Sequence, residues 1–443
     1  MELITVEPGA KRLIEGYKGL EYNLETAVAD LIDNSIAADS NKISIEIRLK
    51  SKTHPTNIII ADDGRGMNKK SLIEAMRYGS KKIYSENDLG KFGLGLKTAS
   101  LSQTNILTVV TKNNKRAKEL IARWDIQYVT EKDRWSLQML DLKELELWER
   151  ELIKLHLKKK GTLVIWKNPE SLKYVNDDTD LKEPEQNLEN HLSMVFCNFL
   201  KRKRSIFVNG ITINPWDPFC SKERTKILKS LNIKCRDKDS KAYTIKVTPY
   251  ILPSEREFSS KEAWDEASGP KKWNRQQGLY FFRNSRLLQA GGWSNCRGNL
   301  EEHQKLLRIK VQMPKQLDNE FGLNITKMRA IIPLEVKLQF EELLSQWRQL
   351  AEKRYRKHHG TCFNKNTSKL IKIIKDKKFR IIEKNGKVHI GLPNLRLPKK
   401  IKKLLNLGKQ NQLSAILYLF LDNWKTLSTA IPNPERIKKK LFS

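Results

Sequence analysis

The sequence predicts an α+β fold, and two patterns support that prediction. Residues 20–40 have apolar side chains at helical spacing, whereas in the segment ISIEIRL, residues 43–49, every second residue is apolar, as in a half-buried strand. Similar helical and strand-like stretches follow one another along the chain. With 443 residues, 39% hydrophobic and 30% charged, the chain has enough apolar material for two or three folded domains.

The first 170 residues are expected to alternate between helices and strands. Short apolar strands are predicted at 57–61, 106–111 and 161–166, and helices at 71–78 and 142–158. The result is an α+β layer with mixed strand order. A helix at 186–201 then leads into a basic cluster at 201–204.

A second α/β segment is predicted beyond that cluster. It has strands at 205–208, 243–247 and 278–282 and a long closing helix from 333 to about 357. The remaining chain is lysine-rich, with amphipathic pieces at 370–375 and 401–407. We therefore predict three domains, at residues 1–200, 201–358 and 359–443, the last a basic and mainly helical C-terminal region.

The net charge points to a polyanionic partner. Lys and Arg number 84 against 51 Asp and Glu, which leaves +33. Such a field favours nucleic acid, because neutralised phosphates release counterions. Residues 351–443 alone contain 24 basic and 5 acidic residues, a net charge of +19. Over half of the excess thus lies in the last fifth of the chain, and DNA is the partner we expect.

Membrane, secreted and disulfide-rich classes are not expected. No apolar run approaches the ~18 residues of a membrane span, and the N-terminus has no apolar leader segment. Five scattered cysteines, never in a CxxC spacing, favour reduced and mostly buried thiols over a disulfide framework or zinc module. The expected location is the cytoplasm, with the nucleoid or the nucleus as the site of action according to the type of cell.

The segment AVADLIDNS places two oxygen-bearing side chains one helical turn apart. Asp30 and Asn34 are four residues apart and share a helix face. An amide oxygen suits Mg²⁺, and a carboxylate one turn earlier could orient or deprotonate a water that attacks a phosphate. The alternative interpretation is an ordinary solvated acidic helix.

The segment DDGRGM follows a buried-type strand and suits a base-binding turn. Asp62 could accept a hydrogen bond from an exocyclic amine, Gly64 and Gly66 let the backbone turn tightly beside a ligand, and Met67 could pack on the ring. Thr162, which opens a later strand after a glycine, could hydrogen-bond the base or the Asp62 carboxylate. The alternative is a plain turn at a strand end.

The segment GKFGLGLK, residues 90–97, suits phosphate binding. Closely spaced glycines before a helix start expose backbone N–H groups and a positive helix end, and Lys97 could add a charge. Neither the Walker A pattern nor a post-strand GxGxxG with a ribose-binding acid is present. P-loop and Rossmann interpretations are therefore excluded.

Taken together, AVADLIDNS, DDGRGM, GKFGLGLKTAS and GT, in this order, resemble the N, G1, G2 and G3 boxes of the GHKL ATPases. That superfamily includes the gyrase ATPase subunit, heat-shock chaperones of the ninety-kilodalton class, MutL-type repair proteins and histidine kinases. The DNS and GLGLKTAS variants and the segment FVNGITINPWDPF resemble MORC-type and MutL-type members most. The resemblance covers residues 12–170 and extends more weakly to 335. It implies a Bergerat-type α/β sandwich ATPase domain followed by an S5-like transducer domain.

The resemblance also implies roles for individual residues. Asn34 would coordinate Mg²⁺, and Asp62 would bind adenine, supported by Thr162. Gly64, Gly66 and Met67 would frame the base. Residues 79–92 would form a moving ATP lid. The residues expected around the ATP phosphates are Gly90, Lys91, Phe92, Gly93, Leu94, Gly95, Leu96 and Lys97.

The expected catalytic residues include one departure from the family. The general base is expected at Asp30, where the family usually has Glu, so its oxygens fall about 1–1.5 Å short and turnover is expected to be slow. In GLNITKMRA, Lys327 resembles the transducer lysine that reaches the γ-phosphate, with Lys315 as second choice. The segment FFRNSRLLQAGGW, residues 281–293, predicts either a basic, aromatic surface or a strand-turn-strand whose aromatics face the core.

The function that these features favour is an ATP-gated homodimeric clamp on DNA. It would act in repair, compaction or defence against foreign DNA, alongside other proteins. One alternative is an ATP-dependent chaperone similar to the heat-shock members, and another is a nucleotide-gated scaffold with little turnover. A histidine kinase and a gyrase-like subunit are disfavoured, because no phosphoacceptor helix precedes the N box and no toprim-type acidic cluster follows.

Overall fold

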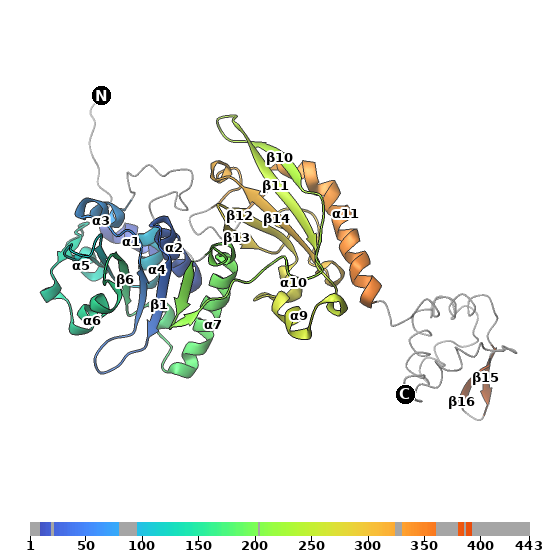
Figure 1. The fold of residues 1–443 in the computed structure, drawn as a ribbon, viewed down its shortest axis with the longest axis horizontal. Coiled ribbons are helices and arrows are strands. Elements are labelled where there is room, and N and C mark those ends of the chain that lie inside the picture. Colours follow the sequence, from blue (N-terminus) through green and yellow to red (C-terminus); the bar gives the residue numbers. More distant parts are fainter. Residues whose placement is uncertain are drawn as a thin grey trace. The chain divides into compact units, whose positions relative to one another are not determined.

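The computed structural model describes residues 9–18, 22–78, 95–202, 204–323, 330–359, 380–384 and 387–391. Residues 1–359 form one compact unit and residues 360–443 a second one. The first unit contains two sheets, each with its own core (Figure 1). In the second unit the described residues form one antiparallel pair, β15 (Arg380–Lys384) and β16 (Lys387–Gly391). The helices predicted for this region fall outside the described residues.

The first sheet has eight strands in the order β5-β4-β3-β6-β2-β1-β7-β8. Every neighbouring pair is antiparallel except β1 and β7, which are parallel. The strands are β1 (Lys42–Arg48), β2 (Asn57–Asp62), β3 (Ile106–Lys112), β4 (Leu120–Asp125), β5 (Gln138–Leu140), β6 (Gly161–Lys167), β7 (Ser205–Val208) and β8 (Ile211–Thr212).

The place of β7 corrects one expectation from the sequence. We predicted residues 205–208 as the first strand of the second domain, but they pair with β1. Ile206 and Val208 are buried in the same core as the apolar residues of β1, which explains the pairing. The first sheet therefore extends past residue 200, to Thr212.

Helices cover both faces of the first sheet. One face packs against α1 (Ala10–Lys18), α2 (Leu24–Ala37), α3 (Lys69–Met76), α4 (Gly95–Gln103), α5 (Ile126–Lys132) and α7 (Asp178–Val195). The other face packs against α6 (Leu147–His156). The predicted helix at 142–158 is shorter than expected, because 142–144 form a separate 3-10 turn and a Glu146–Glu149 capping box starts α6.

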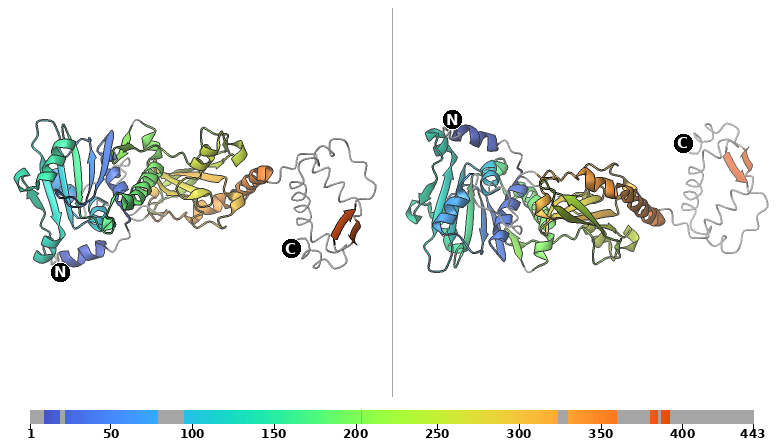
Figure 2. Two further views of the ribbon diagram at one scale, coloured as in Figure 1. Left: turned by 90° about the horizontal axis from the view of Figure 1, so that it is seen from below. Right: turned by 90° about the horizontal axis from the view of Figure 1, so that it is seen from above.

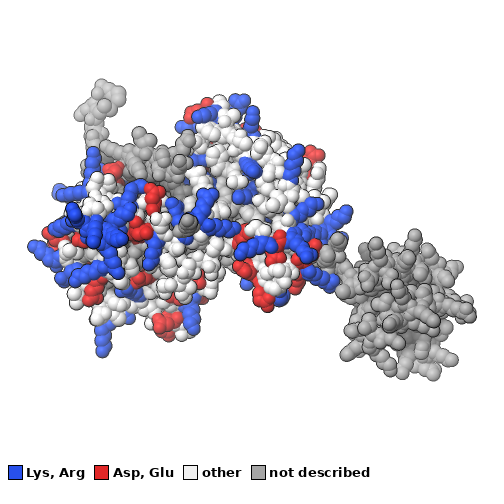
Figure 3. All heavy atoms as spheres, viewed as in Figure 1, with Lys and Arg blue, Asp and Glu red and all other residues white. Residues whose placement is uncertain are grey.

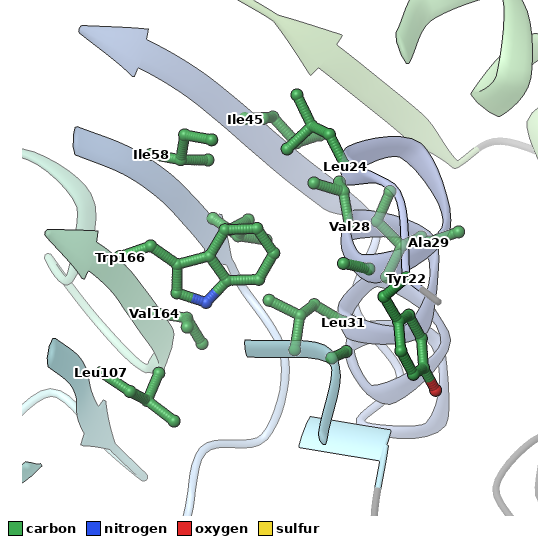
Figure 4. Close-up of a cluster of buried hydrophobic side chains, with 14 of the residues drawn as sticks. Tyr22, Leu24, Val28, Ala29, Leu31, Ile45, Ile58, Leu107, Val164 and Trp166 are labelled. Atoms are coloured by element: carbon green, nitrogen blue, oxygen red, sulfur yellow. The ribbon is translucent and has the colours of Figure 1, made fainter. Parts of the chain in front are cut away.

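Trp166 lies at the centre of the main core. Its ring is fully buried and points from β6 toward α2, where Val28 and Leu31 pack nearby (Figure 4). The strand alternates as the period of two requires: Val164 and Trp166 face α2, while Leu163 and Ile165 face α6. The sheet and α2 are thus held together by apolar side chains from both elements.

The second domain is built on a sheet in the order β10-β11-β14-β12-β13, with β9 paired to β11. One face is covered by the long helix α11 (Leu334–His359), and the other is aromatic, with Trp216, Phe219, Tyr280 and Phe282.

Helix α7 lies between the two sheets in Figures 1 and 2 and contacts both α2 and β13. The strands are β9 (Lys226–Ile227), β10 (Leu231–Arg236), β11 (Ala242–Ile251), β12 (Gly278–Arg283), β13 (Arg286–Ala290) and β14 (Leu307–Met313). The short helices are α8 (Cys197–Leu200), α9 (Lys261–Ala267) and α10 (Lys272–Gln276), with further 3-10 turns at Glu170–Leu172, Glu255–Glu257, Glu302–Gln304 and Lys315–Leu317.

The segment 281–293 is a strand-turn-strand whose large side chains face inward. Arg283, Arg286 and Trp293 are only 1%, 4% and 4% exposed, whereas Asn284 in the turn is exposed. The alternative of a basic, aromatic surface is therefore wrong for this segment. Its arginines are buried groups that need partners.

The described cysteines lie inside two hydrophobic cores. Four cysteines, Cys197, Cys220, Cys235 and Cys296, are free and buried. Burial raises the pKa of the Cys197 thiol to about 11. Within the described ranges, no helix combines the length and hydropathy that a bilayer crossing needs.

We predict that Trp166→Ala lowers the free energy of unfolding by about 3–5 kcal/mol, because it removes a buried ring and leaves a cavity. Tyr174→Ala, at a side chain 82% exposed, should change it by no more than about 0.5 kcal/mol. Urea unfolding followed by circular dichroism measures both. Equal losses would contradict the central position of Trp166.

Candidate nucleotide site

A six-residue stretch of α2 has four polar side chains directed to different parts of the molecule. These residues, which we call the polar turn, are Asp30, Asp33, Asn34 and Ser35. Asp30, Asp33 and Ser35 are 2–4% exposed, whereas Asn34 is exposed at the surface of the helix. A buried polar group is costly unless it is hydrogen-bonded, so each buried member constrains where α2 can lie.

Asp30 is held by a tyrosine from the chain just before α2. The Tyr22 hydroxyl donates to Asp30 Oδ2 at 3.0 Å. Burial and the neighbouring Asp30 charge raise the pKa of Tyr22, so the phenol stays protonated and remains a donor. The carboxylate therefore has a fixed orientation before any substrate arrives.

The start of α4 lies against the same carboxylate. A Cβ added at Gly95 would be 3.7 Å from Asp30 Oδ2, and the buried Thr98 side chain hydrogen-bonds Tyr22. Asp30 of the N box and Gly95 of the G2 box, 65 residues apart, thus lie side by side. Gly95 and Leu96 are the first described residues of α4, and the backbone N–H groups that begin a helix have no partners within it.

Asp62 is anchored at the end of β2. Ser35 Oγ donates to its Oδ2 at 2.9 Å and the Gly64 amide to its Oδ1 at 2.9 Å. Thr162 is its register partner on β6 and donates a backbone hydrogen bond to the carboxylate. Burial raises the pKa of Asp62 above its usual value, and these three donors oppose that rise.

The hydroxyl of Thr162 contacts another threonine. Its Oγ1 lies 3.3 Å from Thr111 Oγ1, which also accepts from the Met67 amide at 2.9 Å and donates to the Gly161 carbonyl at 3.0 Å. Thr111 therefore ties the turn after β2 to β3 and β6. Met67 is half-buried and packs against the main core.

Three glycines allow this close approach of backbones. A Cβ at Gly66 (φ +66°) would be 2.1 Å from the Lys112 carbonyl oxygen, and one at Gly161 (φ +140°) would be 2.0 Å from the Asp62 carbonyl oxygen. At Gly64 a Cβ would be 2.8 Å from Asp62 Oδ1. A larger residue at Gly64 or Gly161 would displace Asp62, and one at Gly66 would displace Lys112.

Lys97 is buried in this structure. It is 2% exposed, and its Nζ donates to the Ala75 carbonyl at 3.0 Å, near the end of α3. Desolvation lowers its pKa to about 8, and the charge of Glu74 opposes this shift. Its contact with a phosphate stays a prediction.

Several predicted residues lie outside the described part of the chain. They are Gly90, Lys91, Phe92, Gly93, Leu94, the rest of the lid segment 79–92, and Lys327. Lys315, the second choice for the transducer lysine, is half-buried at the start of a 3-10 turn after β14.

Sequence reasoning missed Tyr22, Asp33, Ser35 and Thr111. Ser35 and Asp33 flank Asn34 in the segment AVADLIDNS, so their positions are a local signal for a role at this site. Tyr22 and Thr111 act through partners 8 and 51 residues away in the chain. Only the tertiary fold reveals those contacts.

A comparison with protein families agrees with this geometry. Residues 22–162 match the family described as "Histidine kinase-, DNA gyrase B-, and HSP90-like ATPase". This segment is a GHKL-type ATPase domain. The match spans about a third of the chain and begins and ends at residues of the site, Tyr22 and Thr162. A search of curated proteins found no match.

The GHKL domain implies ATP as the ligand, and its residues fit a nucleotide with Mg²⁺. Within the described ranges, no group of three His, Cys, Asp or Glu side chains could hold a metal ion. Mg²⁺ commonly uses one or two protein oxygens together with substrate phosphates. The exposed Asn34, one turn from Asp30, suits that arrangement.

We expect Gly161→Ala to weaken ATP binding at least tenfold, because a Cβ there collides with the Asp62 backbone. Gly210→Ala is the matched control: its φ is +82°, but a Cβ would have no neighbour within 4 Å. Isothermal calorimetry gives both affinities. If the two variants bind ATP equally well, Asp62 is not part of the nucleotide site.

ATP binding should take up protons near pH 8, where Lys97 is about half protonated. Nearby phosphates would raise its pKa, giving uptake of up to about half a proton at pH 8 and almost none at pH 6.5. Calorimetry in buffers of different ionisation enthalpy measures this uptake. It should vanish in Lys97→Met and persist in Lys118→Met, a variant of an exposed lysine. Uptake that survives in Lys97→Met would rule out this role.

Proposed function

We propose that this protein hydrolyses ATP with Mg²⁺ and uses the cycle to close and open a homodimeric clamp on DNA. The observation that supports this most is that α2 carries both Asp30 and Asn34 and is joined to Asp62 by Ser35, in a GHKL-type domain. The second support is the +33 net charge of the chain.

Each site residue has a chemical task in this proposal. The Asp62 carboxylate accepts a hydrogen bond from the adenine amine, with Gly64, Gly66 and Met67 around the base. The first turn of α4 binds phosphate oxygens through backbone N–H groups. Asn34 holds Mg²⁺, which when bound neutralises phosphate charge.

Asp30 is the proposed general base. Its carboxylate orients the attacking water and accepts a proton from it. Tyr22 positions the carboxylate through the hydrogen bond to Oδ2. Because Asp is one methylene shorter than Glu, we propose slow turnover.

DNA is the proposed partner on grounds of charge. Over half of the positive excess lies in residues 351–443. On the face drawn in Figure 3, basic side chains also gather over the left-hand part of the ATPase domain, with acidic ones between them. Exposed basic residues of α1 and α3 include Lys11, Arg12, Lys69 and Lys70. A chaperone would not need this charge. We therefore favour a MORC-type or MutL-type role in repair, compaction or defence, together with other proteins. The proposed location is the nucleoid or the nucleus.

Steady-state ATP hydrolysis with and without duplex DNA tests the proposal. We expect DNA to raise turnover several-fold at low salt and less at high salt. Asn34→Ala and Asp30→Asn should each lower kcat at least 100-fold, whereas Asn187→Ala, at an exposed asparagine of α7, should not. Turnover that ignores DNA would favour a chaperone. ATP binding without turnover would favour a scaffold.

Asp30→Glu should raise kcat about tenfold, because the carboxylate then reaches about 1–1.5 Å further toward the water. The ATP dissociation constant should change less than about threefold, since Asp30 does not hold the base. Asp178→Glu, on the exposed start of α7, controls for the added methylene. A folded Asp30→Glu variant with unchanged or lower kcat would place the base elsewhere.

A further inference from the structure

A buried ion pair joins the second domain to the polar turn of α2. Arg286 Nε, at the start of β13, lies 2.7 Å from Asp33 Oδ1 and 2.8 Å from Oδ2. The side chains are 5% and 2% exposed. The two residues are 253 positions apart in the sequence, so this contact exists only when both domains are folded and docked.

The arginine is fixed on its own side of the contact. Its Nη1 donates to the Leu287 carbonyl at 3.1 Å, and its guanidinium lies 5.3 Å from the Phe196 ring centroid. The preceding turn is held by Asn198, which donates to the Ser285 carbonyl at 3.1 Å. The β12–β13 hairpin therefore presents Arg286 to α2 in one orientation.

The neighbouring His191 does not compete with Arg286 as a positive charge near Asp33. His191 on α7 lies close enough that burial and the charges of Arg286 and Lys271 lower its pKa to about 3. It is neutral at physiological pH and adds no second positive charge. Removing one partner of such a pair leaves an uncompensated buried charge, so α2 would shift rather than tolerate the gap.

Asp33 precedes Asn34 directly and follows Asp30 by three residues. A helix moves as a unit, so a shift of Asp33 also moves the proposed magnesium ligand and the proposed base. The reverse also holds: a nucleotide that draws α2 toward itself pulls on β13 through Arg286. Such a contact couples two sites through one rigid element.

We propose that Arg286 is a positioning residue for ATP turnover, which acts through Asp33 to set the polar turn and links the nucleotide site to the second domain. This inference rests on the proposed ATPase function. In this proposal Arg286 acts through Asp33 and not by direct contact with ATP. Its effect is on the orientation of Asp30 and Asn34.

The test compares two buried arginines of the second domain. Arg286→Met should lower kcat about 30-fold or more with a smaller change in the ATP dissociation constant. Arg308→Met is the control: Arg308 is fully buried and donates to the Pro218 and Ala267 carbonyls at 2.7 Å, away from α2. It should lower the melting temperature similarly but change kcat less than threefold. Both are assayed well below their melting temperatures.

Two further variants separate positioning from folding. Arg286→Lys keeps the positive charge but loses the planar guanidinium group. Its kcat should therefore lie between those of Arg286→Met and the wild type. Arg286→Met combined with Asp33→Asn should lower kcat no more than the worse single variant, because both act through one contact. The inference would be overturned if the loss of kcat in the double variant equalled the product of the two single losses. It would also be overturned if Arg286→Met and Arg308→Met had the same kcat.

A wild type without hydrolysis would refute the ATPase proposal and the effect of Arg286 on turnover, but it would leave the positioning of Asn34 to be tested. ATP affinity with and without Mg²⁺ then provides the readout, because Asn34 is displaced with α2. Arg286→Met should weaken Mg²⁺-dependent binding about tenfold, and Arg308→Met should not. Equal affinities of the two variants would overturn the positioning role.

Discussion

The polar turn of α2 is the constraint on which the rest of the structure depends. A helix packed against a sheet normally buries mostly apolar residues, but α2 also buries Asp30, Asp33 and Ser35 within six residues. Each is satisfied by a different part of the fold: Asp30 by Tyr22, Ser35 by Asp62 at the end of β2, and Asp33 by Arg286 of the second domain. Moving α2 would leave at least one of them without its hydrogen-bond partner. Native proteins rarely bury an unpaired polar group, because its desolvation is costly.

Much of the ATPase domain could be predicted from the sequence, because its signals are local. The alternation in 43–49 and the apolar runs ending at Asp62 and starting at Gly161 correspond to β1, β2 and β6. The i, i+4 spacing of Asp30 and Asn34 indicated their shared helix face. The errors concern non-local pairing. Residues 205–208 have the same alternation wherever they pair, so nothing local shows that they extend the first sheet rather than open the second.

The site illustrates the same division between local and tertiary information. Glycine spacing indicates a tight turn, but not that Gly161 is needed because the Asp62 carbonyl lies 2.0 Å from where its Cβ would be. Likewise, a lysine after a glycine-rich loop suggests a phosphate ligand, yet Lys97 points its ammonium to the Ala75 carbonyl. Arg286 was expected either on a surface or within a core strand. Its partner, 253 residues away, was beyond the reach of any pattern.

The ends of the eight-stranded sheet limit how two copies of this chain could associate. Its edge strands are β5 and β8, with three and two residues, and Ile211 in β8 is 63% exposed. Strands this short offer few unpaired backbone groups to another chain, which is one way that proteins avoid edge-to-edge aggregation. A sheet running continuously from one copy into the next would rest on only a few hydrogen bonds at either edge. Among the described residues, these edges therefore favour pairing of two ATPase domains through side-chain surfaces or exchanged segments over shared strands.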